Sequence, residues 1–249
     1  VNKVLKEFDT DRLRLYPDPC ISELVEAIAD YYNVDKDQVF TGIGSDDVLA
    51  MIFLTFFNSK KPILFPDITY SFYDVWADML RIPYEQVKLT DDLKINATDY
   101  YKENGGIIFP NPNAPTGIAL SLNEVEQIVK TNPNNVVLID EAYVDFGAES
   151  AYNLTKKYDN LLVVMTYSKS RSLAGARLGF AIGNEEIIKD LEKIKFSTNP
   201  YSINRLTLLA GVAALESDSY YKENAKKIIE AREYTVNELE KLGFEILPS

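Results

Sequence analysis

The chain has 249 residues, a formal net charge of −12 and no histidine. Nucleic-acid binding is not expected, because phosphate neutralisation needs clustered Lys and Arg, and no basic cluster occurs. The missing histidine excludes HExxH zinc sites and Ser-His-Asp or Cys-His catalysis, so proton transfer near neutral pH falls to Lys, Asp, Glu, Tyr or the single Cys20.

The sequence shows no apolar segment of the kind that a signal peptide or a transmembrane helix needs. The first residues, VNKVLKEFDTDRL, are charged throughout and hold no signal-peptide core. The longest apolar run, 48–57, is too short to span a bilayer. A single cysteine excludes an intrachain disulfide and fits a cytoplasmic compartment. We therefore expect a cytoplasmic protein with no membrane partner and no metal site.

The N-terminal part begins with a polar arm and leads to a glycine turn. Residues 1–20 end in Tyr16-Pro-Asp-Pro, where two prolines fix an extended segment; on the residues alone, Tyr16 is a surface aromatic. A strand at 39–43 then enters the string Gly42-Ile-Gly44-Ser45-Asp46-Asp47, followed by a helical run. Glycines before a helix let backbone N–H groups approach a ligand, and a helix N-terminus favours anions. Ser45 is expected to cap this helix, and a capped helix without a ligand is the alternative.

The middle of the chain places polar or aromatic residues just after short apolar segments. Tyr70 could stack on a ring or simply pack beside a helix. Asn113 falls in the turn PNPNAPTG, whose proline density ends any strand or helix. Asp140 ends an unbroken apolar run, typical of a parallel sheet covered on both faces, at the strand end where open α/β sheets bind ligands; its alternative is to cap the next turn. The sequence predicts these strands at 62–66, 106–109 and 135–139.

The strongest chemical signal follows the apolar run 161–165. Lys169 stands at the exit of this predicted strand, where desolvation lowers the pKa of an amine and makes it nucleophilic. Such a lysine can form a Schiff base with a carbonyl. The hydroxyls of Thr166, Ser168 and Ser170 and the guanidinium of Arg177 suit a phosphate. Together they suggest pyridoxal phosphate (PLP), and a solvated loop lysine is the alternative.

The remaining segments read as scaffold. The pattern predicts a strand at 176–182, an amphipathic helix at 185–196, and a helical stretch from about 205 to 242 that breaks near 217–219.

The string SKSRSLAGARLGF closely resembles the S-K-x-x-x-L-A-G-x-R-x-G signature of fold type I PLP-dependent aminotransferases, and more narrowly that of the histidinol-phosphate aminotransferase group. The strings RLYPDP, GIGSDD, DITYSFY, PNPNAPTG and DEAY follow the same group's order over about residues 14–204. The resemblance implies a three-layer α/β/α sandwich with a mostly parallel seven-stranded sheet, working as a homodimer. It divides the chain into an N-terminal arm (1–20), a PLP-binding large domain (21–204), and an interdomain helix with the start of a C-terminal small domain that is largely absent (205–249).

The resemblance also implies roles for individual residues. Lys169 would hold the cofactor, Asp140 its pyridine nitrogen and Tyr143 its phenolic oxygen, with Tyr70 stacked on the ring. Ala114 stands where the family has an asparagine that donates to the phenolic oxygen, so that contact is either lost or made by Asn113 or a neighbour. The phosphate would be held by the backbone at Gly44, Ser45 and Asp46, by Thr166, Ser168 and Arg177, and by Tyr16 from the partner subunit.

The implied reaction is amino transfer between L-histidinol phosphate and 2-oxoglutarate in histidine biosynthesis, with Lys169 moving a proton at the substrate α-carbon. Three alternatives stay open: a threonine-phosphate decarboxylase, an aromatic amino-acid aminotransferase, and a catalytically incomplete PLP-binding module. The exact amino donor is undetermined. Arg177 is assigned to the cofactor phosphate and no other arginine falls in a recognisable substrate-binding motif, so the clamp for the substrate carboxylate or phosphate has no assigned source.

Overall fold

A seven-stranded sheet organises the computed structural model, which describes residues 1–249. The strand order is β1-β7-β6-β5-β4-β2-β3. Strands β2 to β6 pair in parallel, whereas β7 runs antiparallel to both β1 and β6. The predicted mostly parallel sheet is confirmed. The strands are β1 (Val39–Gly42), β2 (Ile63–Pro66), β3 (Tyr84–Val87), β4 (Ile107–Pro110), β5 (Val137–Asp140), β6 (Leu161–Thr166) and β7 (Gly179–Gly183).

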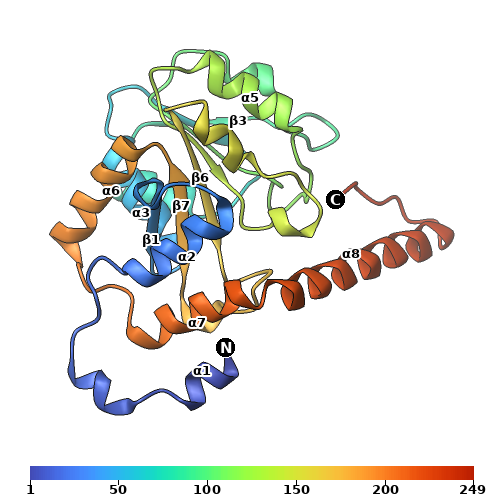
Figure 1. Ribbon diagram of the computed structural model, residues 1–249. Coiled ribbons are helices and arrows are strands. Elements are labelled where there is room, and N and C mark those ends of the chain that lie inside the picture. The colour runs from blue at the N-terminus through green and yellow to red at the C-terminus, as the bar shows by residue number, and fades with distance from the viewer.

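Both faces of the sheet are covered by helices (Figure 1). Successive strand residues point to opposite faces: in β5, Val137 and Ile139 join one core cluster and Leu138 joins the other. Unbroken apolar strands result because neither face meets water. The first cluster packs under α2 (Ser22–Tyr32), α5 (Leu122–Thr131) and α7 (Arg205–Glu216), and the second under α3 (Ser45–Phe56), α4 (Tyr73–Leu80) and α6 (Glu185–Thr198). The three-layer sandwich is confirmed.

The seventh strand, β3, carries no apolar signal in the sequence. Tyr84, Glu85 and Gln86 are exposed, and only Val87 is buried. An edge strand with polar side chains is a common protection against pairing with another chain. The sequence therefore predicted six of the strands and not this one.

The two ends of the chain extend from the sandwich (Figure 1). Helix α8 (Asp218–Lys241) follows α7 after a break at Ser217, as predicted, and buries only Tyr221 and Ala225. Helix α7 packs closely on α2, since a Cβ on Gly211 would lie 2.9 Å from the Leu24 side chain. Residues 205–216 therefore share the core of the large domain, while the proposed domain boundary stays a prediction. The arm contains α1 (Asn2–Lys6) and a 3-10 helix at Thr10–Arg14; further 3-10 helices lie at Lys36–Gln38, Ala97–Tyr100, Val144–Phe146, Ala151–Lys156 and Ala174–Ala176. No helix combines the length and the apolar character needed to cross a bilayer.

Candidate active site

A cavity of about 230 Å³ opens at the carboxyl ends of β4, β5 and β6. Parallel strands bring these ends to one edge of the sheet, where open α/β proteins bind their ligands. Residues far apart in the sequence meet there: Ser45, Asp46, Tyr70, Pro110, Ala114, Asp140, Ala142, Tyr143, Thr166, Ser168, Lys169, Ala174 and Arg177. The structure thus brings together most of the side chains that the sequence selected.

Lys169 stands in the turn that follows β6. Its Nζ lies 4.9 Å from the centroid of the Tyr143 ring, which is the one cation–π contact of this amine. The Thr166 hydroxyl accepts a hydrogen bond from the Ser168 N–H at 3.1 Å, which closes the turn just before the lysine. Lys169 makes no ion pair, so its amine is available to a ligand in the cavity.

Asp140 ends β5 and is buried. Its carboxylate accepts the Tyr73 hydroxyl at 3.0 Å and the Ala142 N–H at 3.2 Å. Burial raises the pKa of Asp140 to about 6, and these two hydrogen bonds oppose the rise. The carboxylate is therefore ionised at pH 7 and retains lone pairs for a further donor. Sequence reasoning gave Tyr73, three residues after Tyr70, no role. Because its side chain is fully buried, its hydroxyl needs a hydrogen-bond partner.

The start of α3 forms an anion cup, by which we mean the N–H groups of Ser45 and Asp46 together with the Arg177 guanidinium. Both N–H groups donate to no acceptor in the protein, as is usual in the first turn of a helix. Gly44 has φ +88, and a Cβ there would lie 2.6 Å from Arg177 Nη2. A Cβ on Gly179, which begins β7, would collide with the Ser45 nitrogen. Two glycines thus allow the backbone to close around the cup.

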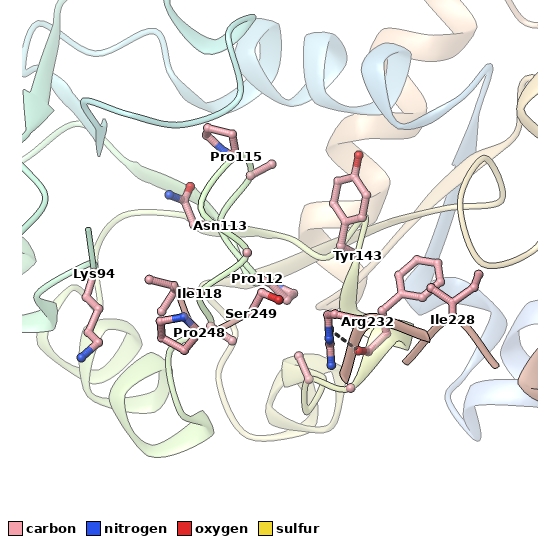
Figure 2. A pocket seen from close by; sticks show the side chains of 16 residues that line it. Lys94, Pro112, Asn113, Pro115, Ile118, Tyr143, Ile228, Arg232, Pro248 and Ser249 are labelled. Carbon is pink, nitrogen blue, oxygen red and sulfur yellow. Dashed lines mark hydrogen bonds between the residues drawn. The ribbon is translucent and has the colours of Figure 1, made fainter. Parts of the chain in front are cut away.

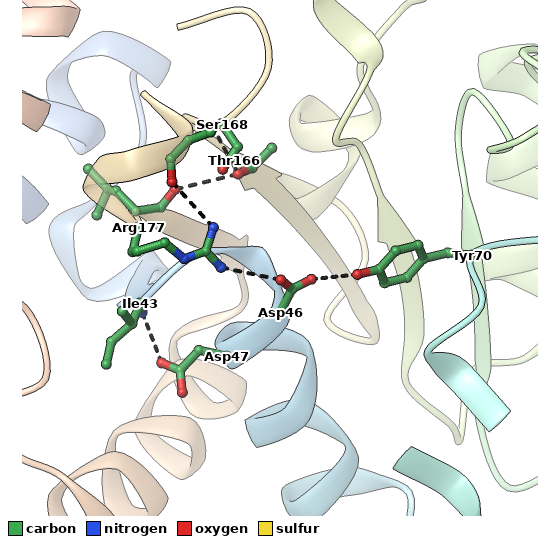
Figure 3. Close-up of polar contacts among 9 residues, drawn as sticks. Ile43, Asp46, Asp47, Tyr70, Thr166, Ser168 and Arg177 are labelled. Atoms are coloured by element: carbon green, nitrogen blue, oxygen red, sulfur yellow. Dashed lines mark hydrogen bonds and ion pairs between the residues drawn. The ribbon is translucent and has the colours of Figure 1, made fainter. Parts of the chain in front are cut away.

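The expectation that Ser45 caps α3 is wrong. The capping position belongs to Gly44, which has no side chain, because the chain turns there through a positive φ. Ser45 is already the first helical residue. Asp47 instead accepts the Ile43 N–H at 2.9 Å, so its carboxylate points back to the turn and away from the cup (Figure 3).

Asp46 points the other way, and its carboxylate engages the Arg177 guanidinium of the cup but neither of its N–H groups (Figure 3). Its carboxylate accepts the Tyr70 hydroxyl at 2.8 Å and pairs with Arg177 at 3.3 Å. Burial and the hydrogen bond to Asp46 raise the pKa of Tyr70 above its ordinary value. The cup therefore holds an anionic group, and that group is a carboxylate of the same chain.

Three predicted residues, Gly44, Asn113 and Tyr16, do not line the cavity. Asn113 is buried, but its amide donates to the Ile68 carbonyl at 3.0 Å and accepts the Thr69 hydroxyl at 3.1 Å. This arrangement does not support a contact from Asn113 to the cofactor. Tyr16 is 76% exposed, and its ring stacks on Tyr201 at 4.6 Å between centroids.

A second cavity of about 770 Å³ lies between the loop 112–119 and α8 (Figure 2). Ala114 and Tyr143 line both cavities. Arg232 reaches into the second one from α8, where it donates to the Phe146 carbonyl at 3.2 Å. Although larger, this cavity lacks the lysine, the buried carboxylate and the anion cup, so the smaller cavity is the candidate site on chemical grounds.

Arg171 follows Lys169 by two residues and is buried on the other side of the same turn. It pairs with Asp218 at 2.9 Å and lies over the Tyr31 and Tyr221 rings at 5.1 and 5.5 Å. We call these three partners the Arg171 cage. The cage ties the lysine turn to α2 and α8, a role that sequence reasoning did not assign.

Comparison with known proteins places this chain in a family. The model of aminotransferase class I and II matches residues 1–249. The histidinol-phosphate aminotransferase of Clostridium botulinum (strain Okra / Type B1) is 49% identical over 249 residues, which are all of this chain and 70% of that protein. Histidinol-phosphate aminotransferase 1 of Hydrogenovibrio crunogenus is 54% identical over 239 residues, covering 96% of this chain and 67% of that one. The crystal structure of histidinol-phosphate aminotransferase from Sinorhizobium meliloti in complex with pyridoxal-5'-phosphate is similar with a TM-score of 0.87 at 22% identity, over 96% of this chain and 67% of that chain. The chain belongs to the aminotransferase class I and II family.

Proposed function

We propose that this protein is a histidinol-phosphate aminotransferase that binds PLP and transfers an amino group between L-histidinol phosphate and 2-oxoglutarate. Relatives of that name share about half of their aligned residues with this chain. The observation that carries the proposal is the position of Lys169, in a cavity that also holds a buried carboxylate and an anion cup. Each of these groups matches one part of the cofactor.

The residues present fit PLP. Arg177 and the Tyr70 hydroxyl bind the anionic Asp46 carboxylate at the N-terminus of α3, so these two donors suit an anionic oxygen. The N–H groups of Ser45 and Asp46 remain for a phosphate. Thr166 and Ser168 add hydroxyls from the adjacent turn. Asp140 is ionised at neutral pH and can accept a hydrogen bond from the protonated ring nitrogen.

The bound cofactor supplies a ring that takes up the electron pair left at the substrate α-carbon. The work of the protein is done by few side chains. Lys169 holds the cofactor and then carries the proton removed from the α-carbon. The buried Asp140 carboxylate stabilises positive charge on the nitrogen beside it. The anion cup fixes the phosphate end, and the Tyr143 ring limits where the Lys169 amine can stand.

The substrate clamp is the weaker part of this chain. Arg177 is the only arginine that lines the cavity, and Asp46 pairs with it. Arg171 is enclosed in its cage, and Arg205 donates to the Tyr16 carbonyl at 2.5 Å. An unclamped substrate loses much of the gain from orientation, which reaches about 7–11 kcal/mol at its largest. The cavity therefore binds PLP without an arginine that is free to orient the substrate.

The test is a screen of amino donors in the half-reaction, followed by the absorbance of the bound cofactor. We expect L-histidinol phosphate to convert the cofactor faster than aromatic amino acids do, and Lys169→Ala to show no conversion. Release of CO₂ from O-phosphothreonine would favour the decarboxylase. Retained PLP with no conversion by any donor would favour the incomplete binding module.

We also propose that the protein is a cytoplasmic homodimer in which each cavity receives Tyr16 from the partner subunit. Tyr16 is exposed and lies outside the cavity of its own chain. Helix α4 presents an exposed apolar stripe made of Phe72, Val75 and Met79, and such a stripe is typical of an interface.

Mixing two inactive or weakened variants tests the sharing of Tyr16. A heterodimer of a Tyr16→Phe subunit and a Lys169→Ala subunit would carry both lesions in one cavity and leave the other intact. Activity should therefore exceed that of either variant after mixing. A monomer in ultracentrifugation, or no gain on mixing, would rule the sharing out.

A further inference from the structure

One segment beside the cavity is closed on itself by a single side chain. We call residues 141–151 the Glu141 bracket. Glu141 is 2% exposed, and its carboxylate accepts the Ala151 N–H at 2.6 Å and the Ser150 hydroxyl. Its own N–H donates to the Val164 carbonyl of β6 at 2.8 Å. Residue 141 is therefore fixed to the sheet, and residues 150 and 151 are fixed to the side chain of residue 141.

The bracket contacts the lysine turn at two points. The Tyr143 ring lies 4.9 Å from Lys169 Nζ. Asp145 accepts a hydrogen bond from Ser170, the residue after the lysine. Both contacting residues lie between the two ends that Glu141 joins, so movement of the bracket would move both contacts.

Glu141 itself does not line the cavity. Burial raises the pKa of Glu141 to about 8 against the hydrogen bonds from Ser150 and Ala151, which shows that the site tolerates the cost of a buried carboxyl group. An apolar residue of similar volume would avoid this cost, but it could not accept either hydrogen bond. The carboxyl group therefore closes the bracket in a way that an apolar side chain could not.

We propose that Glu141 is a positioning residue for Lys169, because it holds Tyr143 and Asp145 against the lysine turn. The proposal rests on the proposed function only in taking Lys169 as the lysine that holds PLP. It predicts that shape and hydrogen bonding at residue 141 matter, whereas its charge does not.

Three variants separate these properties. Glu141→Gln removes the charge and can keep both contacts, with its Oε1 accepting the Ala151 N–H and its Nε2 donating to the Ser150 hydroxyl in the reverse direction. Glu141→Ala removes both hydrogen bonds. Glu149→Ala is the matched control, because Glu149 lies in the same bracket, is exposed and makes no hydrogen bond or ion pair. PLP titration, circular dichroism of the bound cofactor and hydrogen exchange of the amides in 142–150 provide the measurements.

We expect Glu141→Ala to weaken PLP binding roughly tenfold, as the loss of buried hydrogen bonds implies, to change the circular dichroism of the cofactor and to speed exchange in 142–150. Glu141→Gln should stay within about twofold of the wild type and Glu149→Ala should match it. Faster exchange with unchanged PLP affinity and dichroism would reduce Glu141 to a structural residue and overturn the proposal, as would equal damage from Gln and Ala.

Ser150→Ala covers the case in which Glu141→Ala does not fold. It removes one hydrogen bond from Glu141 and should shift the cofactor signal in the same direction by a smaller amount. An unchanged signal in Ser150→Ala would overturn the proposal. Borohydride labelling of wild-type Lys169 tests the proposed function separately, so failure there is distinguishable from failure of Glu141 to position the turn.

Discussion

Two cationic side chains of one turn, Lys169 and Arg171, have opposite surroundings. Arg171 is buried with a carboxylate and two aromatic rings, all of them from scaffold helices. Lys169 faces a cavity and has one ring beside it. Within the protein, the Arg171 guanidinium has an anionic partner and two aromatic rings. The Lys169 amine has no anionic partner and is available to a ligand. Unmet bonding capacity, more than charge, thus distinguishes the ligand side of the turn from the scaffold side.

Replacing the available cation should give the largest loss of activity. Lys169→Ala should reduce transamination at least about a thousandfold, because it removes both the covalent anchor and the proton carrier. PLP should still bind noncovalently through the anion cup. Borohydride reduction and peptide mapping of the wild type should place the pyridoxyl group on Lys169, and a label on another lysine would contradict the assignment.

Replacing the enclosed cation should instead reduce stability. Arg171→Ala removes a mostly buried ion pair, whereas Asp218 keeps the Lys222 ammonium and the Tyr31 hydroxyl as partners, so the loss should be about 1.5–3 kcal/mol of unfolding free energy. Arg177→Ala is the matched comparison, because its ion pair with Asp46 is half-exposed and should contribute under about 1 kcal/mol, while PLP affinity falls. Urea unfolding and PLP titration of both variants measure the contrast, and equal destabilisation would break it.

Asp140→Asn should slow the proton-transfer step by a factor of about 10²–10³, the usual effect of removing one electrostatic stabiliser. Because the pKa of Asp140 lies near 6 in the ligand-free protein, PLP binding to the wild type should weaken as the pH falls below 6 and the carboxylate becomes protonated. The Asn variant should lack this acid limb. Half-reaction rates equal to those of the wild type would exclude the role.

Glu141→Gln should change the pH dependence of stability with little effect near pH 5. The pKa of Glu141 is raised from 4.5 to about 8 in the folded protein, so the folded state binds the extra proton between these values. Stability is therefore highest below the lower value and falls as the pH rises towards 8, by up to about 1.4 kcal/mol per pH unit. The Gln variant should show a smaller fall in unfolding free energy between pH 5 and 8, and an unchanged slope would contradict the assignment.

Tyr73→Phe should have the smallest effect, about 1 kcal/mol of unfolding free energy. Loss of its hydroxyl removes a hydrogen bond that stabilises the Asp140 carboxylate, so the pKa of Asp140 should rise further and the acid limb of PLP binding should move to higher pH. Tyr84→Phe, at the exposed edge strand, is the control. An unmoved limb in Tyr73→Phe would show that the hydroxyl does not act on Asp140.

Local sequence patterns predicted the buried strands and several residues of the cavity. Apolar runs identified the strands that are covered on both faces, and short motifs identified Lys169, Asp140 and Tyr70 as cavity residues. Strand β3 gave no such run because its side chains face solvent.

Partners from distant elements could not be predicted in the same way. The hydroxyl of Tyr73 meets Asp140 across the sheet edge, and Arg171 meets Asp218 from α8. The Asn113 amide is turned towards residues 68 and 69, where it donates to the Ile68 carbonyl and accepts from the Thr69 hydroxyl. Such choices depend on three-dimensional proximity, which a single sequence does not encode locally.

The antiparallel strand β7 sets the order in which this site can be built. Val39 of β1 pairs with Ile182 of β7, and β1 has no other neighbour in the sheet. A pairing so distant in sequence is expected to form slowly, since loop closure precedes the contacts that stabilise it. On the ribosome, the anion cup at the end of β1 therefore gains its fixed place only after β7 has emerged, and earlier lengths of the nascent chain carry the glycine turn without a binding site.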